Sequence, residues 1–102
     1  MIGIFSKTTD SNFVEAAGYA GIDFIILDQE HGPITNETLY NHVRAAKVSD
    51  MKSFVSVPVN FPHLIGTALD SGADGVQVPN ISSYKEALNA VKAAIKEIVN
   101  RL

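Results

Sequence analysis

Two kinds of hydrophobic pattern alternate along the chain. Short, nearly continuous apolar runs have the length of strands, and between them lie longer segments whose apolar residues recur every three or four positions, as in amphipathic helices. The apolar runs predict strands at residues 2–6, 24–30, 52–59 and 75–79. Strand and helix alternate four times, which predicts an α/β fold with a parallel sheet and right-handed crossovers.

Start and stop signals for helices fall between the predicted strands. Gly21 and Gly72 end the first and third helices, because a glycine in the left-handed conformation commonly follows a helix. The last helix is predicted over residues 83–102, with Ser83 and Glu86 as a capping box. The residues that suit the starts of the first three helices are Asp10 or Ser11, Thr35 or Asn36, and Pro62.

Residues 14–28 resemble residues 65–79, which makes a weak internal repeat. Gly21 matches Gly72, and Asp23 matches Asp74. A corner between a helix and a strand often needs a glycine and a polar residue, so the repeat indicates equivalent βα units rather than a shared function.

Length and composition fit one soluble domain over residues 1–102, with 46% hydrophobic and 19% charged residues. The net charge of −3, without a basic cluster, argues against nucleic-acid binding. The chain has no cysteine, which excludes disulfides, thiolate metal sites and cysteine nucleophiles. No apolar run approaches the ~20 residues of a membrane helix, and the first residues do not resemble a signal peptide. We therefore expect a cytoplasmic protein that does not bind membranes.

The second predicted strand ends in the polar stretch "DQEHGP", residues 28–33. Parallel α/β folds bind ligands at the carboxyl ends of their strands, where Asp28, Glu30 and His31 are expected. His31 is a candidate general base, because the ordinary pKa of histidine lies near neutrality. The alternative is that these residues only mark a chain returning to solvent. Other polar residues expected at the same end are Ser6, Lys7, Thr8, Thr9, Asn60 and Asn80.

Three further residues have ordinary structural interpretations from the pattern alone. His42 lies in the middle of a predicted helix and His63 near the start of another, so both are expected to be structural or solvated. Asp70 lies late in the third predicted helix and, from its position alone, is a polar helix-end residue.

Two stretches together resemble the HpcH/HpaI aldolase family of metal-dependent (class II) pyruvate aldolases. They are "EAAGYAGIDFIILDQEHGP", from residue 15, and "ALDSGADGVQVPNI", from residue 68. The resemblance extends over about residues 2–90 and implies a TIM barrel. It also implies a carbon–carbon lyase acting on a 2-oxo acid with Mg²⁺ or Mn²⁺. By the same resemblance, His31 is the catalytic acid/base, Asp70 supports it, and Asp28 and Glu30 surround the substrate.

The sequence departs from the family pattern in two ways. Where the family has an arginine that binds the substrate carboxylate, this chain has Ser56, in "FVSVP". Lys7 is the nearest candidate for a replacement cation. The family's metal ligands lie on later strands and would fall beyond Leu102, since a (βα)8 barrel takes about 250 residues. The chain therefore corresponds to four βα units, half of such a barrel.

These departures leave three functional hypotheses. The chain is an aldolase-like lyase that is inactive or impaired alone, or it is an engineered or fragmentary half-barrel scaffold that self-associates without catalysis. A small-anion binding module is the third. A half-barrel has two unpaired sheet edges and an uncovered apolar face, so we expect a homodimer or higher oligomer, preferably a closed eight-stranded barrel. A monomer would need helices on both faces of the sheet, as in flavodoxin-like folds.

Overall fold

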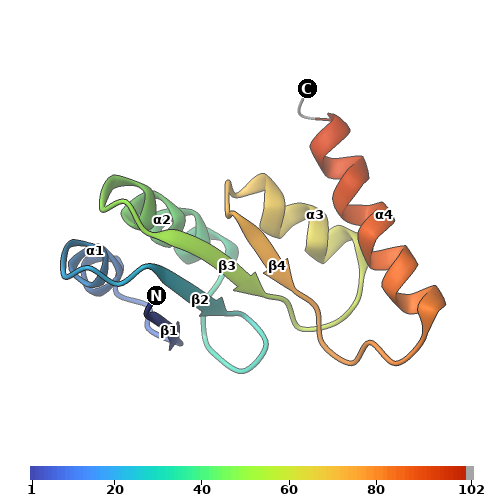
Figure 1. The fold of residues 1–102 in the computed structure, drawn as a ribbon, viewed down its shortest axis with the longest axis horizontal. Helices are drawn as coiled ribbons and strands as arrows, with labels where there is room; N and C mark the ends of the chain where they lie inside the picture. Colours follow the sequence, from blue (N-terminus) through green and yellow to red (C-terminus); the bar gives the residue numbers. More distant parts are fainter. Residues whose placement is uncertain (101–102) are drawn as a thin grey trace.

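The computed structural model describes residues 1–100 as four strands and four helices in strict alternation (Figure 1). The strands form one parallel sheet in the order β1-β2-β3-β4, so each strand pairs with the next in the sequence. The predicted α/β order is confirmed, and the predicted end of the last helix at residues 101–102 lies outside the described residues. The elements are β1 (Gly3–Ser6), α1 (Ser11–Tyr19), β2 (Phe24–Asp28), α2 (Asn36–Val48), β3 (Lys52–Ser56), α3 (Pro62–Asp70), β4 (Gly75–Gln77) and α4 (Tyr84–Asn100).

Three strands end two or three residues earlier than the apolar pattern predicts. β2 stops at Asp28 because its carboxylate accepts hydrogen bonds from the amides of Glu30 and His31, which turn the chain. β3 and β4 stop just before Val57-Pro58 and Val78-Pro79, and a proline has no amide to donate to a sheet. The apolar residues beyond these points extend the hydrophobic surface without extending the sheet.

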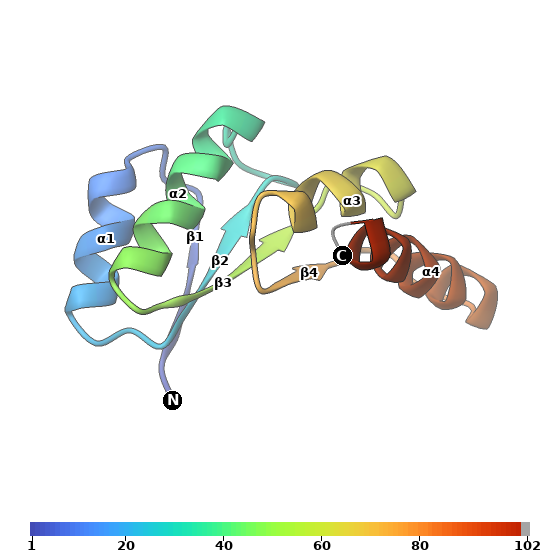
Figure 2. The same ribbon diagram turned by 90° about the horizontal axis from the view of Figure 1, so that it is seen from above.

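Helices α1, α2 and α3 lie on one face of the sheet, and α4 packs beside α3 past the β4 edge (Figure 2). Ile25, Leu27 and Val55 point into the helix layer and are fully buried. Alternate residues of the strands, such as Phe5, point to the other face, which no helix of residues 1–100 covers. The flavodoxin-like arrangement, with helices on both faces, is therefore wrong for this part of the chain. No helix in residues 1–100 is long and apolar enough to cross a membrane.

Two aromatic rings lie across glycines on this uncovered face. A Cβ atom at Gly3 would come 2.1 Å from the ring of Phe24, and one at Gly75 would come 2.8 Å from the ring of Phe54. The two rings meet edge to face, with centroids 6.1 Å apart. Each glycine thus leaves room for a ring from the neighbouring strand.

Three equivalent corners lead from a helix into a strand. Gly21 and Gly72 have φ angles of +96° and +94°, and Asp50 occupies the corresponding place before β3 with φ +59°. At two of these corners a carboxylate caps the preceding strand. Asp23 accepts from the Ile2 amide at 2.7 Å, and Asp74 accepts from the Ser53 amide at 2.8 Å. The internal repeat of the sequence therefore encodes corner geometry.

The predicted helix starts are confirmed with one change. Asp10 caps α1 and Thr35 caps α2, each by a side-chain oxygen that accepts a backbone amide. At α4 the Ser83 hydroxyl accepts from the Glu86 amide, but the Glu86 carboxylate bonds to Ser82 instead of closing the box on Ser83. Hydrogen bonds from the Ser82 hydroxyl, the Ser82 amide and the Ser83 hydroxyl hold the pKa of Glu86 below its ordinary value.

Candidate functional site

The turn after β2 is built on the carboxylate of Asp28. This side chain is buried, with 1% of its surface exposed, and its Oδ1 accepts from the amides of Glu30 (2.9 Å) and His31 (3.0 Å). Two charge-assisted hydrogen bonds from consecutive amides fix the backbone on which the following side chains stand. Asp28 therefore fixes the shape of the turn, and its Oδ1 is already engaged in these two hydrogen bonds.

Glu30 and His31 form an ion-pair contact at the surface of this turn. The His31 Nε2 lies 3.5 Å from Glu30 Oε1, and the two side chains are 68% and 25% exposed, respectively. A carboxylate at this distance gives the ring a polar partner and limits its orientations. The imidazole thus reaches solvent at the carboxyl end of a buried strand, where it can exchange a proton with a bound molecule.

Gln29 ties the turn to the elements on either side of it. Its amide donates to the Ser56 carbonyl at 3.0 Å, continuing the β2–β3 ladder by one bond. Its side-chain amide donates to the Ile34 carbonyl (3.3 Å) and to Asn36 Oδ1 (3.2 Å), at the start of α2. The segment that carries His31 is therefore held to β3 and α2.

Gly32 closes the turn against the loop that follows β1. A Cβ atom at this position would come 2.8 Å from the Asp28 carbonyl oxygen, and 3.1 and 3.2 Å from Cβ and Cγ of Lys7. The backbone contact is the rigid one, so a larger residue would push the turn away from Asp28. The stem of Lys7 therefore lies directly against the residue next to His31.

Ser56 is buried at the carboxyl end of β3, where it pairs with Asp28 on one side and Gln77 on the other. Ser56 therefore lies beside the turn that follows β2, and its hydroxyl brings no charge there. Gln77 is a site neighbour that the sequence reasoning missed. The signal was the polar residue between two valines in "GVQVP", which places Gln77 on the face opposite Val76.

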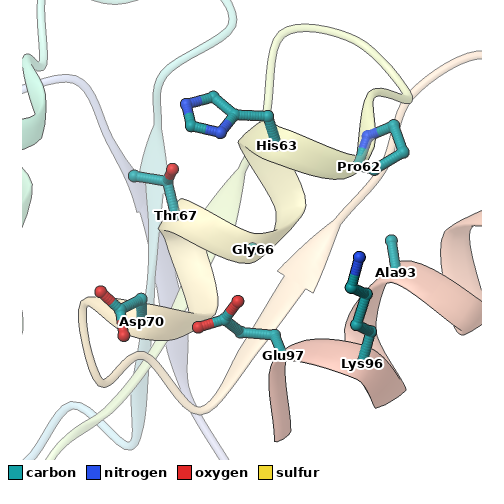
Figure 3. A pocket seen from close by; sticks show the side chains of 8 residues that line it. All are labelled: Pro62, His63, Gly66, Thr67, Asp70, Ala93, Lys96 and Glu97. Atoms are coloured by element: carbon teal, nitrogen blue, oxygen red, sulfur yellow. The ribbon is translucent and has the colours of Figure 1, made fainter. Parts of the chain in front are cut away.

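Asp70 does not lie with the other predicted site residues. It is the last residue of α3, and the chain after it leads to Asp74, which bonds to Ser53 at the amino end of β3. His31 follows the carboxyl end of β2, so the two residues lie toward opposite ends of the strands. Asp70 instead lines a groove of about 350 Å³ between α3 and α4 (Figure 3). The expected support of His31 by Asp70 is not formed within one chain.

His42 and His63 are a structural and a solvent-exposed residue, respectively, as the sequence predicts. His42 is fully buried on α2, where Nε2 lies 2.8 Å from the Thr8 carbonyl oxygen and Nδ1 lies 2.7 Å from Ser11 Oγ. A carbonyl oxygen only accepts, so Nε2 carries the proton, and in the neutral ring Nδ1 accepts from the hydroxyl. His42 thus fastens the β1–α1 loop to α2, while His63 is exposed on the first turn of α3.

Residues 1–100 contain no group of three or more His, Cys, Asp or Glu side chains that could hold a metal ion. Of the two carboxylates at the β2 turn, Asp28 is engaged by backbone amides and Glu30 contacts His31. These residues do not make a divalent-metal site by themselves.

The family model of the HpcH/HpaI aldolase/citrate lyase family matches residues 1–100. The chain belongs to this family. It is 34% identical over 92 residues to a 2-dehydro-3,6-dideoxy-6-sulfogluconate aldolase of Pseudomonas putida, covering 90% of this chain and 36% of that protein. It is also 34% identical to a hydroxypyruvate/pyruvate aldolase of Agrobacterium fabrum, covering 90% of this chain and 35% of the relative. The chain thus spans about a third of the length of these family members.

Solved structures of family members contain the same fold. The four βα units match an HpcH/HpaI aldolase/citrate lyase family protein from Burkholderia cenocepacia with a TM-score of 0.84 and 28% identity, covering 91% of this chain and 37% of that structure. The citrate synthase SbnG matches with a TM-score of 0.84 and 33% identity, covering 89% and 37%. The family assignment and the predicted half of a TIM barrel are confirmed.

Proposed function

We propose that this chain carries the proton-transfer part of an aldolase site, with His31 as the acid/base. The substrate is a 2-oxo acid, cleaved or extended at the carbon next to its carbonyl group. The observation that carries the proposal is the exposed imidazole of His31, 3.5 Å from the Glu30 carboxylate on a turn anchored by Asp28. Support also comes from relatives that are themselves aldolases, one of them named for hydroxypyruvate and pyruvate.

In the proposed reaction the neutral imidazole takes a proton from C3 of the 2-oxo acid, and the electron pair of that C–H bond forms the enolate. Addition of the enolate carbon to an aldehyde makes the new carbon–carbon bond, and the imidazolium returns its proton to the resulting alkoxide. The Glu30 carboxylate stabilises the imidazolium between these steps. Cleavage follows the same path in reverse.

The activity of this chain alone is proposed to be low. Ser56 offers a neutral hydroxyl where a charged donor would hold the substrate carboxylate more strongly. The chain also spans only about a third of the relatives' length, so the activity of a whole family member is not attributed to it. The cytoplasmic location expected from composition stays a prediction.

Exchange of the methyl protons of pyruvate with D₂O tests the role of His31, because enolate formation is sufficient for exchange. The chain is incubated with pyruvate and added Mg²⁺ or Mn²⁺, and the methyl signal is followed by proton NMR. We expect His31→Ala to slow exchange by at least about 100-fold, a typical loss for a general base. His63→Ala, which removes an exposed histidine on α3, is the matched control. Equal exchange by the chain and His31→Ala would contradict the proposal.

A second candidate function, self-association as a half-barrel, is favoured by the uncovered sheet face. Phe5 is 56% exposed there, and Phe24 and Phe54 are only partly covered. β1 and β4 are the outer strands of the sheet. Two copies related by a twofold axis would place β4 of each beside β1 of the other, in parallel. Light scattering then gives a molar mass near twice 11.0 kDa, whereas a mass of one chain contradicts this candidate.

A further inference from the structure

The charges around the β2 turn do not by themselves suit an anionic substrate. Asp28 and Glu30 bring two carboxylates to the turn, and Ser56 beside them is neutral. A 2-oxo acid carries a carboxylate at neutral pH, and like charges at this distance repel. Apart from His31, whose imidazole the proposed reaction uses in its neutral form, residues 28–33 carry no basic side chain, so a cation beside this turn strengthens the binding of such a substrate.

Lys7 is in a position to supply this charge. It directly follows Ser6, which pairs with Leu27, so Lys7 lies beside the place where β2 ends at Asp28. Cβ and Cγ of Lys7 approach within 3.1 and 3.2 Å of the place where a Cβ atom of Gly32 would lie, so the stem is packed on the residue after His31. The packed stem reduces the entropy lost when the ammonium group binds a ligand.

Within residues 1–100, no ion pair joins the Lys7 ammonium group to a carboxylate. The ion pair found in this part of the chain joins Glu30 to His31. The remaining cations of residues 1–100 belong to other surfaces. They are Arg44 and Lys47 on α2, Lys52 at the amino end of β3, and Lys85, Lys92 and Lys96 on α4.

We propose that Lys7 binds the carboxylate of the 2-oxo acid and holds the substrate beside His31. The inference rests on the proposed aldolase function, and it assigns the specificity for an acid rather than a neutral carbonyl compound. Lys7 acts in substrate binding and takes no part in proton transfer. Its loss therefore weakens affinity and raises KM, while kcat changes little.

Direct binding of pyruvate tests the proposal separately from catalysis. The ¹⁵N-labelled chain is titrated with pyruvate, and the amide signals of His31 and Gly32 give Kd. We expect Lys7→Gln to raise Kd about tenfold or more, because a hydrogen bond to a charged group is lost. Lys7→Arg keeps the charge and retains most of the affinity. Lys92→Gln removes the same charge from the exposed surface of α4 and serves as the matched control.

The outcomes separate this inference from the proposed function. Equal Kd values for the chain and Lys7→Gln overturn the role of Lys7, and so does an absence of saturable pyruvate binding by the chain itself. Binding that depends on Lys7, together with proton exchange that does not depend on His31, keeps the Lys7 assignment and overturns the acid/base proposal. Weaker binding by Lys7→Gln and Lys92→Gln alike would show a general charge effect and also overturn the assignment.

Discussion

Asp50 is the one non-glycine residue among the three corners that lead from a helix into a strand. Its φ of +59° lies in the left-handed region, where a side chain is strained, and the equivalent positions are occupied by Gly21 and Gly72. We expect Asp50→Gly to raise the free energy of unfolding by about 0.5–1 kcal/mol, since relief of the strain exceeds the added freedom of the unfolded chain. Urea unfolding followed by circular dichroism measures this change.

The matched control for this prediction is Gly21→Ala. A Cβ atom at Gly21 meets nothing within 4 Å, so this substitution tests the backbone conformation without a steric clash. It should lower the free energy of unfolding by about 1 kcal/mol. A stabilising Gly21→Ala or a destabilising Asp50→Gly would show that the corner geometry does not determine these energies.

Glu86, at the start of α4, should make the stability of the folded chain depend on pH. Hydrogen bonds from Ser82 and Ser83 hold the pKa of Glu86 below its ordinary value of 4.5 in the folded chain. The charged carboxylate therefore stabilises the folded state above pH 4.5, and this contribution is lost as the pH falls through the lowered pKa. Thermal unfolding measured at about pH 5 and pH 3 should show a smaller loss of Tm for Glu86→Gln than for the unchanged chain. An equal loss in both proteins would contradict the prediction.

Elements with local signals could be predicted from the sequence, and those that depend on distant partners could not. The capping residues Asp10 and Thr35 and the glycines after α1 and α3 act within one turn of the chain, so the pattern locates the helices. Strand ends were predicted too late because apolar residues such as Val57 and Val78 remain partly or fully buried beyond the last ladder pairs. Hydrophobicity reports burial, whereas a strand also needs amides that can pair, and Pro58 and Pro79, which follow these valines, have none to donate.

At the candidate site, too, local signals could be predicted from the sequence, and contacts between distant residues could not. The turn at Asp28 was predictable, because a strand followed by "DQEHGP" must bring these residues to the carboxyl end of the sheet. The separation of Asp70 from His31 also follows from the topology, because a helix between parallel strands ends near the amino end of the next strand; only the family resemblance placed Asp70 beside His31. Ser56 and Gln77 become neighbours of the turn only through strand register, which residue patterns in one strand do not specify.

At the scale of the whole molecule, the uncovered face of the sheet determines how copies of the chain interact. Phe5 lies on this face on the outer strand β1, whereas Val48 is 61% exposed at the end of α2, in the helix layer. If the face closes on a second copy, Phe5→Lys should shift the chain to a monomer, since it buries an unpaired charge at the contact. Val48→Lys should not, and sedimentation velocity distinguishes the two.

The simple strand order has a consequence for how the chain acquires its structure during synthesis. Every strand pairs with the one made just before it, and the paired residues are separated by only about 21 to 28 positions, as in Gly3 with Phe24 and Phe24 with Lys52. These separations are close to the shortest that a parallel pair joined by a helix allows, which limits the loop-closure entropy that each pairing costs. The first βαβ unit, which contains the β2 turn and His31, can therefore assemble on the ribosome while α4 is still being translated.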